Sequence, residues 1–428
     1  MKKLLWSFMI ISLSLKAQTV DLAFEKDLIP EGIAVHLPSN KVYLNSLVKN
    51  KIVRSNLDGS HPEDFISTGQ YGYLSGFGMT IKGDTLYALG NSLAKTNNKS
   101  ILLLLDITSG RLIGSYSLNQ PDFIYLNDIA ISSKGDVFIT DSESNNIYTI
   151  NKSKNQLEVF FSDDQIKHPN GIAISPDDRL LYFASYTHGI RILDLATKKL
   201  INKPNDHKGI DGMKFYGNSL IAIVNSKRDA TQNGIYRFYL NEKNSEVVQK
   251  EKLKNFARSS DIPTTFDLHG DTIFFIGDSQ LDVLNQETSE IIDASTLENY
   301  RLIIHNMVDQ GKESEKNTVF SKRYCTEIGR FDLLIDNDEV AGAYYLAHKK
   351  ALGGVWGRLK GNIMTGRWHD ADGKGDIVIT FNEDFSFFTA DYRNENEPEK
   401  WYKDSWHGAL RPNDSNTFSL NEKTYRCE

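Results

Sequence analysis

Residues His168 to Leu195 read HPNGIAISPDDRLLYFASYTHGIRILDL. An apolar run meets a turn of Pro and Asp, a run rich in aromatic and branched residues follows, and a third apolar run comes after a short gap. This alternation, with turn residues at every break, predicts three antiparallel strands. A polar residue, Asn170, stands just before the first strand. One such Asn decides nothing, so its meaning depends on whether the pattern recurs.

The pattern does recur along the first three hundred residues. Each copy has a short apolar strand, a turn of Gly, Asp, Asn or Pro, a second strand and a third strand that ends in a polar turn. Six copies start 41 to 53 residues apart, a spacing close to that of propeller blades. The other five begin with GIAVHLPSNKVYLNS at Gly32, GMTIKGDTLYALGNS at Gly78, DIAISSKGDVFITDS at Asp128, GMKFYGNSLIAIVNS at Gly212 and TFDLHGDTIFFIGDS at Thr265.

Six such units predict an all-β fold, a six-bladed β-propeller over residues 18–308. A β-sandwich or another all-β solenoid is the alternative for the same strand pattern. In a propeller the first strand of every blade lines the central channel, so equivalent positions in successive blades form a ring around the axis. The residue just before each first strand is therefore informative. In chain order these residues are Glu31, Phe77, Asn127, Asn170, Asp211 and Thr264.

Four of these six ring residues carry side-chain oxygens that suit a hard divalent cation. Glu31 and Asp211 supply carboxylates, and Asn127 and Asn170 supply amide carbonyls, which are ligands that Ca²⁺ prefers and that Zn²⁺ also accepts in part. Any one of them taken singly is explained by turn chemistry. Two carboxylates close together at an axis need a compensating positive charge. The ring therefore predicts a divalent-metal site.

Several motifs together resemble those of the senescence marker protein/gluconolactonase family, which includes regucalcin and bacterial sugar lactonases. The motifs are IPEGIAV, LNDIAISSKGDVFITDS, HPNGIAISPDDRLLYFAS and IDGMKF, and the resemblance covers residues from about 25 to 300. The resemblance implies a six-bladed propeller with one catalytic divalent metal. It assigns metal binding to Glu31, Asn170 and Asp211, and it places Asn127 beside the substrate or in the metal shell.

The sequence departs from that family at the expected substrate contacts. Sugar lactonases of the family often carry an Arg two residues before the ND asparagine, and Tyr125 occupies that position here. Phe77, itself a ring residue, is a second aromatic residue near this place. The predicted channel mouth is therefore more aromatic than a sugar site needs. His188, in a loop between strands, is a further candidate for substrate contact, with a solvated loop histidine as the alternative.

The expected chemistry is hydrolysis of a lactone or ester. The metal would polarise the carbonyl, and Asp211 would act as general base toward the attacking water. The alternative is a non-enzymatic propeller that holds a structural metal and binds a protein or glycan, because one fold hosts many functions. An isomerase that uses the same pocket is a third reading. The sequence has no GxSxG motif and no phosphate-binding glycine loop.

The N-terminus predicts export. Residues 1–17 combine two early lysines, an apolar run from Leu4 to Leu15 and a small Ala17, which is typical of a signal peptide and too short for a membrane span. We therefore expect a periplasmic or secreted protein. Removing these residues takes away three lysines and no acids, and it changes the formal charge from −7 to −10. This charge argues against nucleic acid and anionic membranes as partners.

The repeat ends at a charged segment, residues 309–321, which we interpret as a linker. Residues 322–428 then alternate apolar and polar residues between glycine turns, which predicts a small antiparallel barrel or sandwich. Cys325 and Cys427 lie at its two ends and predict a disulfide, with two free thiols as the alternative. Four tryptophans in this part would either bind a glycan or cell-surface ligand, or pack a small core: Trp356, Trp368, Trp401 and Trp406.

Overall fold

The computed structural model describes residues 18–93, 98–119, 122–225, 232–256, 261–285, 288–307, 320–336, 339–346, 351–382, 385–410, 417–420 and 423–427. The expected signal peptide, residues 1–17, and residues 309–319 of the expected linker lie outside these ranges. The described chain consists of strands and short 3-10 helices, which confirms the all-β prediction. No helix within the described ranges is long and apolar enough to cross a membrane.

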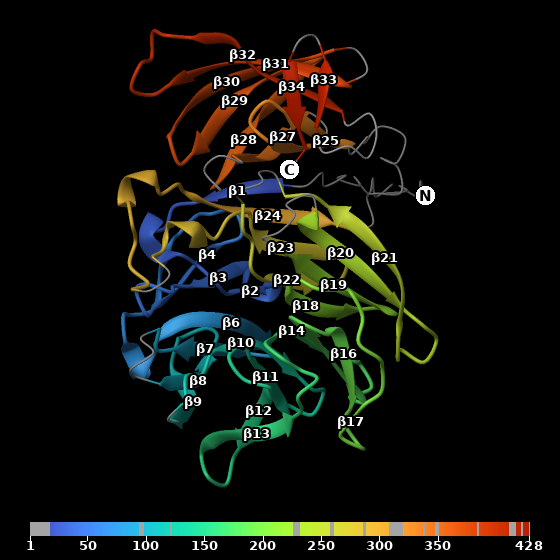
Figure 1. The fold of residues 1–428 in the computed structure, drawn as a ribbon. Helices are drawn as coiled ribbons and strands as arrows, with labels where there is room; N and C mark the ends of the chain where they lie inside the picture. Colours follow the sequence, from blue (N-terminus) through green and yellow to red (C-terminus); the bar gives the residue numbers. More distant parts are fainter. Residues whose placement is uncertain are drawn as a thin grey trace, which may run out of the picture.

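The N-terminal part has a propeller-like arrangement of antiparallel sheets (Figure 1). Four of its sheets have four strands each. They contain β2 (Ile33–His36), β3 (Lys41–Asn45), β4 (Ile52–Asn56) and β5 (Glu63–Ile66); β14 (Pro169–Ile174), β15 (Leu180–Ser185), β16 (Gly189–Asp194) and β17 (Lys199–Leu200); β18 (Ile210–Tyr216), β19 (Ser219–Val224), β20 (Gly234–Leu240) and β21 (Val247–Lys254); and β22 (Phe266–His269), β23 (Thr272–Ile276), β24 (Tyr300–Asn306) and β1 (Gln18–Leu22).

The remaining strands of this part form one sheet of eight. Its two halves are runs of four consecutive strands, and a single parallel residue pair, Gln156 with Ser117, joins them. The first half contains β6 (Ser75–Lys82), β7 (Thr85–Asn91), β8 (Lys99–Asp106) and β9 (Leu112–Asn119). The second half contains β10 (Leu126–Ile131), β11 (Val137–Asp141), β12 (Asn146–Asn151) and β13 (Gln156–Ser162).

The first strands of these units surround a common axis. Neighbouring first strands contact each other in the order β2, β6, β10, β14, β18 and β22, and β22 returns to β2. The N-terminal strand β1 completes the last sheet of the circle. It pairs with β24, so that Val20 lies opposite Leu302. Short 3-10 helices lie in the connections: η1 (Lys26–Leu28), η2 (Leu37–Ser39), η3 (Gln70–Gly72), η5 (Leu281–Val283) and η6 (Ala294–Thr296).

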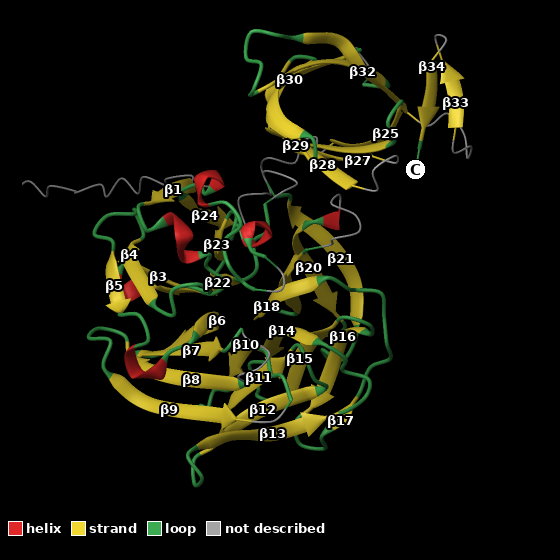
Figure 2. Cartoon of the chain, turned by 60° about the vertical axis from the view of Figure 1, so that its left-hand side comes forward, coloured by secondary structure: helices red, strands yellow, loops and turns green. Residues whose placement is uncertain are grey.

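The C-terminal part is a β-barrel, one of the two architectures that the sequence predicts. Each strand from β25 to β32 pairs with the next, and β25 also pairs with β32, so the ring closes (Figure 2). A hairpin of β33 and β34 extends from β25. The strands are β25 (Phe320–Thr326), β26 (Arg330–Asp336), β27 (Glu339–Leu346), β28 (Ala351–Lys360), β29 (Ile363–Asp370), β30 (Gly373–Phe381), β31 (Phe387–Asn394), β32 (Tyr402–Leu410), β33 (Thr417–Leu420) and β34 (Lys423–Arg426).

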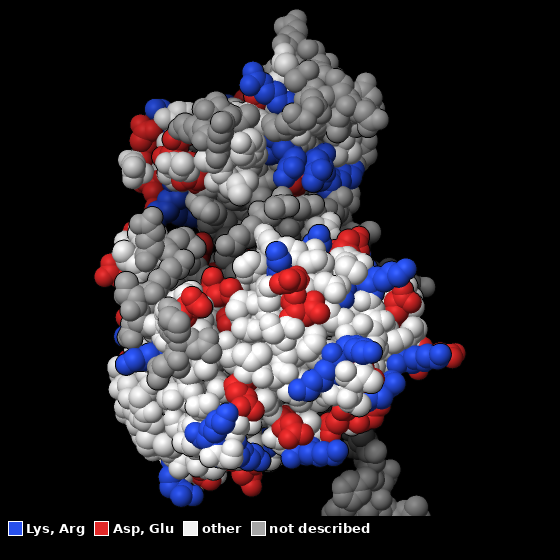
Figure 3. Space-filling model, turned by 60° about the horizontal axis from the view of Figure 1, so that its bottom comes forward, with Lys and Arg blue, Asp and Glu red and all other residues white. Residues whose placement is uncertain are grey.

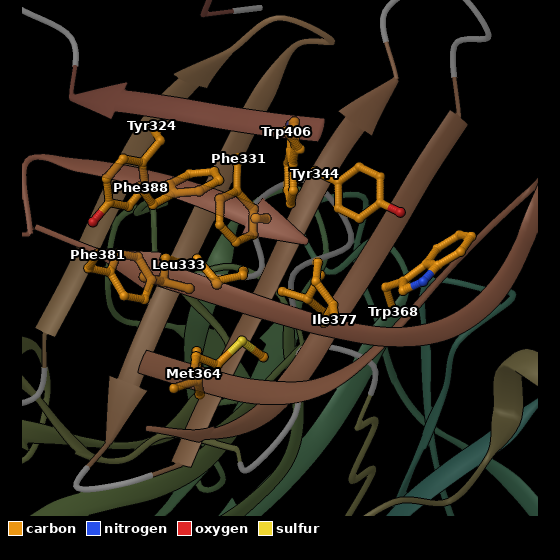
Figure 4. Packing of buried hydrophobic residues seen from close by; sticks show 14 of the residues in the cluster. Tyr324, Phe331, Leu333, Tyr344, Met364, Trp368, Ile377, Phe381, Phe388 and Trp406 are labelled. Atoms are coloured by element: carbon orange, nitrogen blue, oxygen red, sulfur yellow. The ribbon is translucent and has the colours of Figure 1, made fainter. Parts of the chain in front are cut away.

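Large side chains fill the inside of this barrel (Figure 4). Trp406 packs against Phe331 and Phe388, with ring centroids 4.9 and 5.2 Å apart. Trp368 is also buried in this cluster, so two of the four tryptophans pack the core. Trp356 and Trp401 are half-buried. Whether the barrel binds a glycan therefore stays a prediction.

The predicted disulfide between Cys325 and Cys427 is confirmed. It joins the first strand of the barrel to the residue after β34, across 102 residues of sequence. Both cysteines are buried, together with Ala409 and Tyr425. The bond therefore ties the terminal hairpin to the closed ring of strands.

Candidate metal and substrate site

Four first strands carry a register shift where the predicted ring residues lie. The shifts fall between Gly76 and Met79, Leu126 and Ile129, Pro169 and Ile172, and Ile210 and Met213. A β-bulge leaves an extra residue unpaired and turns its side chain away from the regular sheet face, and bulges are frequent next to active sites. In these four strands the bulge contains Phe77, Asn127, Asn170 and Asp211.

Glycines beside the ring residues let neighbouring first strands approach closely. A Cβ atom on Gly32 would lie 2.1 Å from the carbonyl oxygen of Phe77, and one on Gly171 would lie 2.1 Å from that of Asp211. Both distances are far below van der Waals contact, so no larger residue fits without a backbone shift. One hydrogen bond joins the last ring residue to the first. The Thr264 hydroxyl donates to the backbone carbonyl of Glu31 at 2.8 Å.

The structure brings the four predicted metal ligands to one cavity. Glu31, Asn127, Asn170 and Asp211 all line it, together with Asp128 and Thr264. The cavity has a volume of about 10 Å³, which is close to the space that one water molecule or ion occupies. The repeat position therefore finds these side chains, but the expectation that each precedes its strand is wrong for three of them. Asn127, Asn170 and Asp211 lie within β10, β14 and β18, because the bulges there continue the pairing on both sides of them.

Hydrogen bonds orient the Asp211 carboxylate from both sides. Asn170 Nδ2 lies 3.0 Å from Asp211 Oδ1, and Asn225 Nδ2 lies 3.2 Å from Asp211 Oδ2. Because both amides donate through nitrogen, their oxygens face elsewhere. Three buried oxygens near this ring have no hydrogen-bond partner: Glu31 Oε2, Asn170 Oδ1 and Asn225 Oδ1.

The electrostatics of the site are set by its crowded carboxylates. Burial raises the pKa of Glu31 well above its ordinary value of 4.5, and the charge of Asp211 raises it further. The Thr264 hydroxyl partly offsets these effects, and Asp128 adds another repulsive charge. Among the described residues, no group of three or more His, Cys, Asp and Glu side chains has a metal-binding arrangement. Any metal shell here therefore needs amide oxygens.

Two aromatic residues flank the carboxylates. Phe77 is fully buried, and its ring packs edge-on against Tyr125 with centroids 4.4 Å apart. Burial raises the pKa of Tyr125, and the charges of Glu31 and Asp211 raise it further. The Tyr125 hydroxyl is therefore held neutral beside these two carboxylates, as a candidate hydrogen-bond donor. The structure places Tyr125 beside these carboxylates and Phe77 in the core against its ring, and neither lines the small cavity.

His188 is not brought to the cavity. It lies half-buried in the turn between β15 and β16, where its Nδ1 atom is 2.7 Å from the hydroxyl oxygen of Thr187. It is absent from the residues that line the axial cavity. Its predicted role in substrate contact has no support from a contact with the ring.

Sequence reasoning missed Asn225 and Asp128 as members of the site. Asn225 follows β19, and the sequence signal is a polar residue that recurs at the end of the second strand in each copy. Asn45 and Asn91 occupy this position in earlier copies and bind first-strand backbone, at Gly32 N (2.8 Å) and Leu126 N (3.0 Å). Asn225 differs because it also contacts the Asp211 carboxylate.

Asp128 stands where most copies have glycine after the ring residue. It is almost completely buried, and its two oxygens accept hydrogen bonds from Ile129 N at 2.8 Å and Ile172 N at 3.1 Å. The Lys214 ammonium lies 3.6 Å from Asp128 Oδ1. This carboxylate therefore links two neighbouring first strands beneath the ring.

The bulged first strands and the axial oxygens define a propeller-like protein with a polar site on its axis. Residues 29–218 match the model of the SMP-30/Gluconolactonase/LRE-like region, which confirms the resemblance that the motifs predict for this part of the chain. A search of curated protein sequences finds no match.

Solved structures with similar folds include three enzymes, each of which covers 68% of this chain. A luciferin-regenerating enzyme is 14% identical, with 96% of its chain covered and a TM-score of 0.46. The PQQ-bound aldose sugar dehydrogenase from Streptomyces coelicolor is 12% identical, with 98% covered and a TM-score of 0.46. Virginiamycin B lyase from Staphylococcus aureus is 16% identical, with 99% covered and a TM-score of 0.41. None of these likenesses bears on activity.

Proposed function

We propose that this protein is an exported, divalent-metal-dependent hydrolase of lactones or esters, built on a six-bladed β-propeller. The blade count rests on dividing the eight-stranded sheet at its single joining pair, Gln156 with Ser117. It is supported by the cyclic contacts of six first strands and by buried apolar clusters between successive units. The expected location, periplasmic or secreted, agrees with the buried disulfide.

The donor set fits a hard divalent cation, most simply Ca²⁺, with Zn²⁺ as the alternative. The unpaired buried oxygens of Glu31, Asn170 and Asn225 are the observation that carries this assignment. Buried polar atoms normally have partners, and an unpaired buried acceptor costs about 1–3 kcal/mol. Glu31, Asn127, Asn170 and Asp211 would hold the ion, with Asn225 added by the structure. A bound cation would also relieve the repulsion between the Glu31 and Asp211 carboxylates.

A divalent cation at this place supplies polarisation of a substrate carbonyl and stabilisation of negative charge on its oxygen. The residues of the chain supply orientation and proton transfer. Asp211 is the candidate general base, because Asn170 and Asn225 fix the direction of its two oxygens. Asn127 is held by Ser142, at 3.0 Å from Asn127 Nδ2 to the serine Oγ atom, and would position the carbonyl.

The ring of Tyr125 gives the site an apolar side, and Phe77, fully buried in the core, packs against this ring. A neutral tyrosine hydroxyl can donate one hydrogen bond, whereas an Arg at this position would bind several hydroxyls or a carboxylate. We therefore propose small aliphatic or aromatic lactones and esters as substrates, in preference to sugar lactones.

The experiment is hydrolysis by the purified protein, followed by proton release. Aliphatic, aromatic and sugar lactones are tested with Ca²⁺, with Zn²⁺ and with a chelator. We expect turnover that requires metal, favours the less polar lactones, and falls by about 10²-fold or more in Asp211→Asn. Asp206→Asn is the matched control, because the Asp206 side chain is 92% exposed. Turnover that survives both the chelator and Asp211→Asn would contradict the proposal.

The size of the axial cavity favours one second candidate function. A space of about 10 Å³ holds an ion but not a lactone, so a substrate has to lie outside it. A metal enclosed only by protein ligands is typical of structural sites. The alternative is therefore a non-enzymatic propeller that binds a protein or glycan partner. Tight metal binding without hydrolysis of any ester or lactone would favour it.

A further inference from the structure

A second and larger cavity lies farther along the same first strands. Its volume is about 590 Å³, and residues from all six first strands line it. Ile129 and Ile172, for example, follow Asn127 and Asn170 of the ring on β10 and β14. This lower cavity is separate from the axial cavity, and none of the predicted metal ligands lines it.

The lower cavity has the character of a small-molecule site. Its volume falls within the range of about 300–1,000 Å³ that is typical of ligand pockets, which are mostly apolar with a few polar groups. Its exposed walls are apolar and polar in nearly equal measure. The polar lining side chains are His36, Thr80, Asp84, Lys214, Asp267 and His269. The apolar lining includes Ile81, Ile129, Ile131, Ile174, Phe215 and Leu268.

Two of the polar groups are already partnered with each other. Asp267 Oδ2 accepts a hydrogen bond from Val35 N at 2.7 Å and lies 3.2 Å from His269 Nε2, while Asp267 Oδ1 accepts from Leu268 N at 2.8 Å. The Asp267 carboxylate raises the pKa of His269. The pair therefore offers little net charge to a ligand when His269 is protonated.

Lys214 is different, because its ammonium keeps unused hydrogen-bond donors. Its Nζ atom lies 3.6 Å from Asp128 Oδ1, which is an ion pair but longer than a hydrogen bond. Both Asp128 oxygens already accept hydrogen bonds from backbone nitrogens. The Lys214 side chain is only 18% exposed and lines the lower cavity. A partly buried ammonium gains from an acceptor that can satisfy its remaining donors.

We propose that the lower cavity binds a small amphipathic organic anion, an aromatic or aliphatic body that carries one carboxylate or sulfonate. The body packs against the isoleucines, and the anionic group accepts hydrogen bonds from Lys214 Nζ. The proposal does not depend on hydrolysis at the axial site, because the two sets of lining residues differ. Lys214 is the electrostatic anchor, and the aliphatic walls select for apolar area.

The experiment uses the full protein and the fluorescent probe 8-anilinonaphthalene-1-sulfonate, with N-phenyl-1-naphthylamine as its uncharged counterpart. We expect saturable binding of the sulfonate at one site, weakened about tenfold in Lys214→Met, since a charge-assisted hydrogen bond is lost. Lys214→Arg should retain binding, and Lys250→Met, on the exposed face of β21, should not change it. The uncharged probe should respond little to Lys214→Met.

A second variant locates the site independently of charge. Thr80, half-buried on β6, lines the lower cavity, so Thr80→Trp should fill it and abolish binding of both probes. Asp211→Asn, which alters only the axial site, should leave binding unchanged. Near-ultraviolet circular dichroism checks that each variant is folded. Sulfonate binding that is absent, or that is the same in Lys214→Met and Thr80→Trp as in the parent protein, overturns the proposal.

Discussion

At the scale of single residues, the site depends on two carboxylates that repel each other. Burial and the charge of Asp211 raise the pKa of Glu31 above 4.5, so in the folded protein this group holds its proton more tightly than in the unfolded chain. A carboxyl with a raised folded pKa stabilises the fold below its ordinary pKa. This stabilisation is lost as pH rises toward the raised value. In the absence of metal, stability from this group therefore falls with rising pH.

Glu31→Gln tests this assignment, because it keeps the shape of the side chain and removes its titration. We expect the metal-free variant to be more stable than the parent by roughly 1–2 kcal/mol at pH 8, since a buried unpaired charge is gone. The difference should shrink toward pH 4. Urea unfolding with chelator at several pH values measures it. Glu290→Gln, on an exposed side chain, is the control. A difference that grows as pH falls would contradict the assignment.

Asn225 gives a second test at this scale, because the structure adds it to the predicted ligands. Asn225→Ala removes a hydrogen bond to Asp211 Oδ2 and one unpaired oxygen. We expect metal affinity to fall about tenfold, as is usual when a residue that orients a ligand is lost. Calorimetric titration with Ca²⁺ measures it, and Asn218→Ala, in an exposed turn, is the control. Unchanged affinity would remove Asn225 from the site.

The sequence predicts the four ring residues because their position recurs, not because of their residue type. Asn170 alone is an ordinary turn residue, and it becomes informative only beside Asn127 and Asp211 at equivalent places. Asn225 escapes this reasoning, because polar residues at the end of second strands mostly bind backbone, as Asn45 does. Its side chain reaches Asp211 only through the packing of two strands of one sheet, which the sequence does not reveal.

At the scale of the elements, close contact between bulged first strands builds the ring. The repeat predicts these strands, but it does not predict the pairing of Gln18–Leu22 with β24, which joins residues far apart in sequence. Nor does it predict the pairing between β9 and β13 that merges eight strands into one sheet. Both depend on edge strands that meet only after folding. Local alternation carries no information about such partners.

Gly171→Ala tests the close approach of β14 and β18. The added Cβ would lie 2.1 Å from the Asp211 carbonyl oxygen, so the backbone that carries Asp211 has to move. We expect a loss of stability of roughly 1–3 kcal/mol and strongly weakened metal binding. Gly277→Ala is the matched control, because its Cβ would meet Ile303 at an ordinary 3.5 Å. Thermal unfolding and Ca²⁺ titration report both effects, and equal behaviour of the two variants would refute the argument.

The disulfide gives a prediction for the barrel. Replacing both Cys325 and Cys427 by Ser removes a cross-link over 102 residues. We expect the barrel to lose about 2–4 kcal/mol, a typical value for such a loop. Differential scanning calorimetry should show a lower unfolding temperature for the barrel, both in the variant and in the reduced parent protein. The metal-binding affinity should not change, because the cross-link lies outside the axial site. A change in metal affinity would contradict this separation.

At the scale of the whole molecule, a propeller-like part and a barrel lie side by side, with the barrel on one side of the sheets in both ribbon views (Figures 1 and 2). The sequence predicts both all-β parts, because strand alternation and turn residues are local signals. On the face drawn in Figure 3, the described acidic and basic side chains are interspersed. The oxygen atoms of the candidate site lie instead on the propeller axis.

The axial oxygens of Glu31, Asn127, Asn170 and Asp211 are proposed to bind one divalent cation. The most direct measurement is calorimetric titration of Ca²⁺ into chelator-treated protein, repeated with Asp211→Asn and with the exposed Asp206→Asn. We expect one site per chain, with a Kd of about 10⁻⁶ to 10⁻⁴ M, retained in Asp206→Asn and lost in Asp211→Asn. No binding of Ca²⁺ or Zn²⁺, or binding that is unaffected by Asp211→Asn, would contradict it.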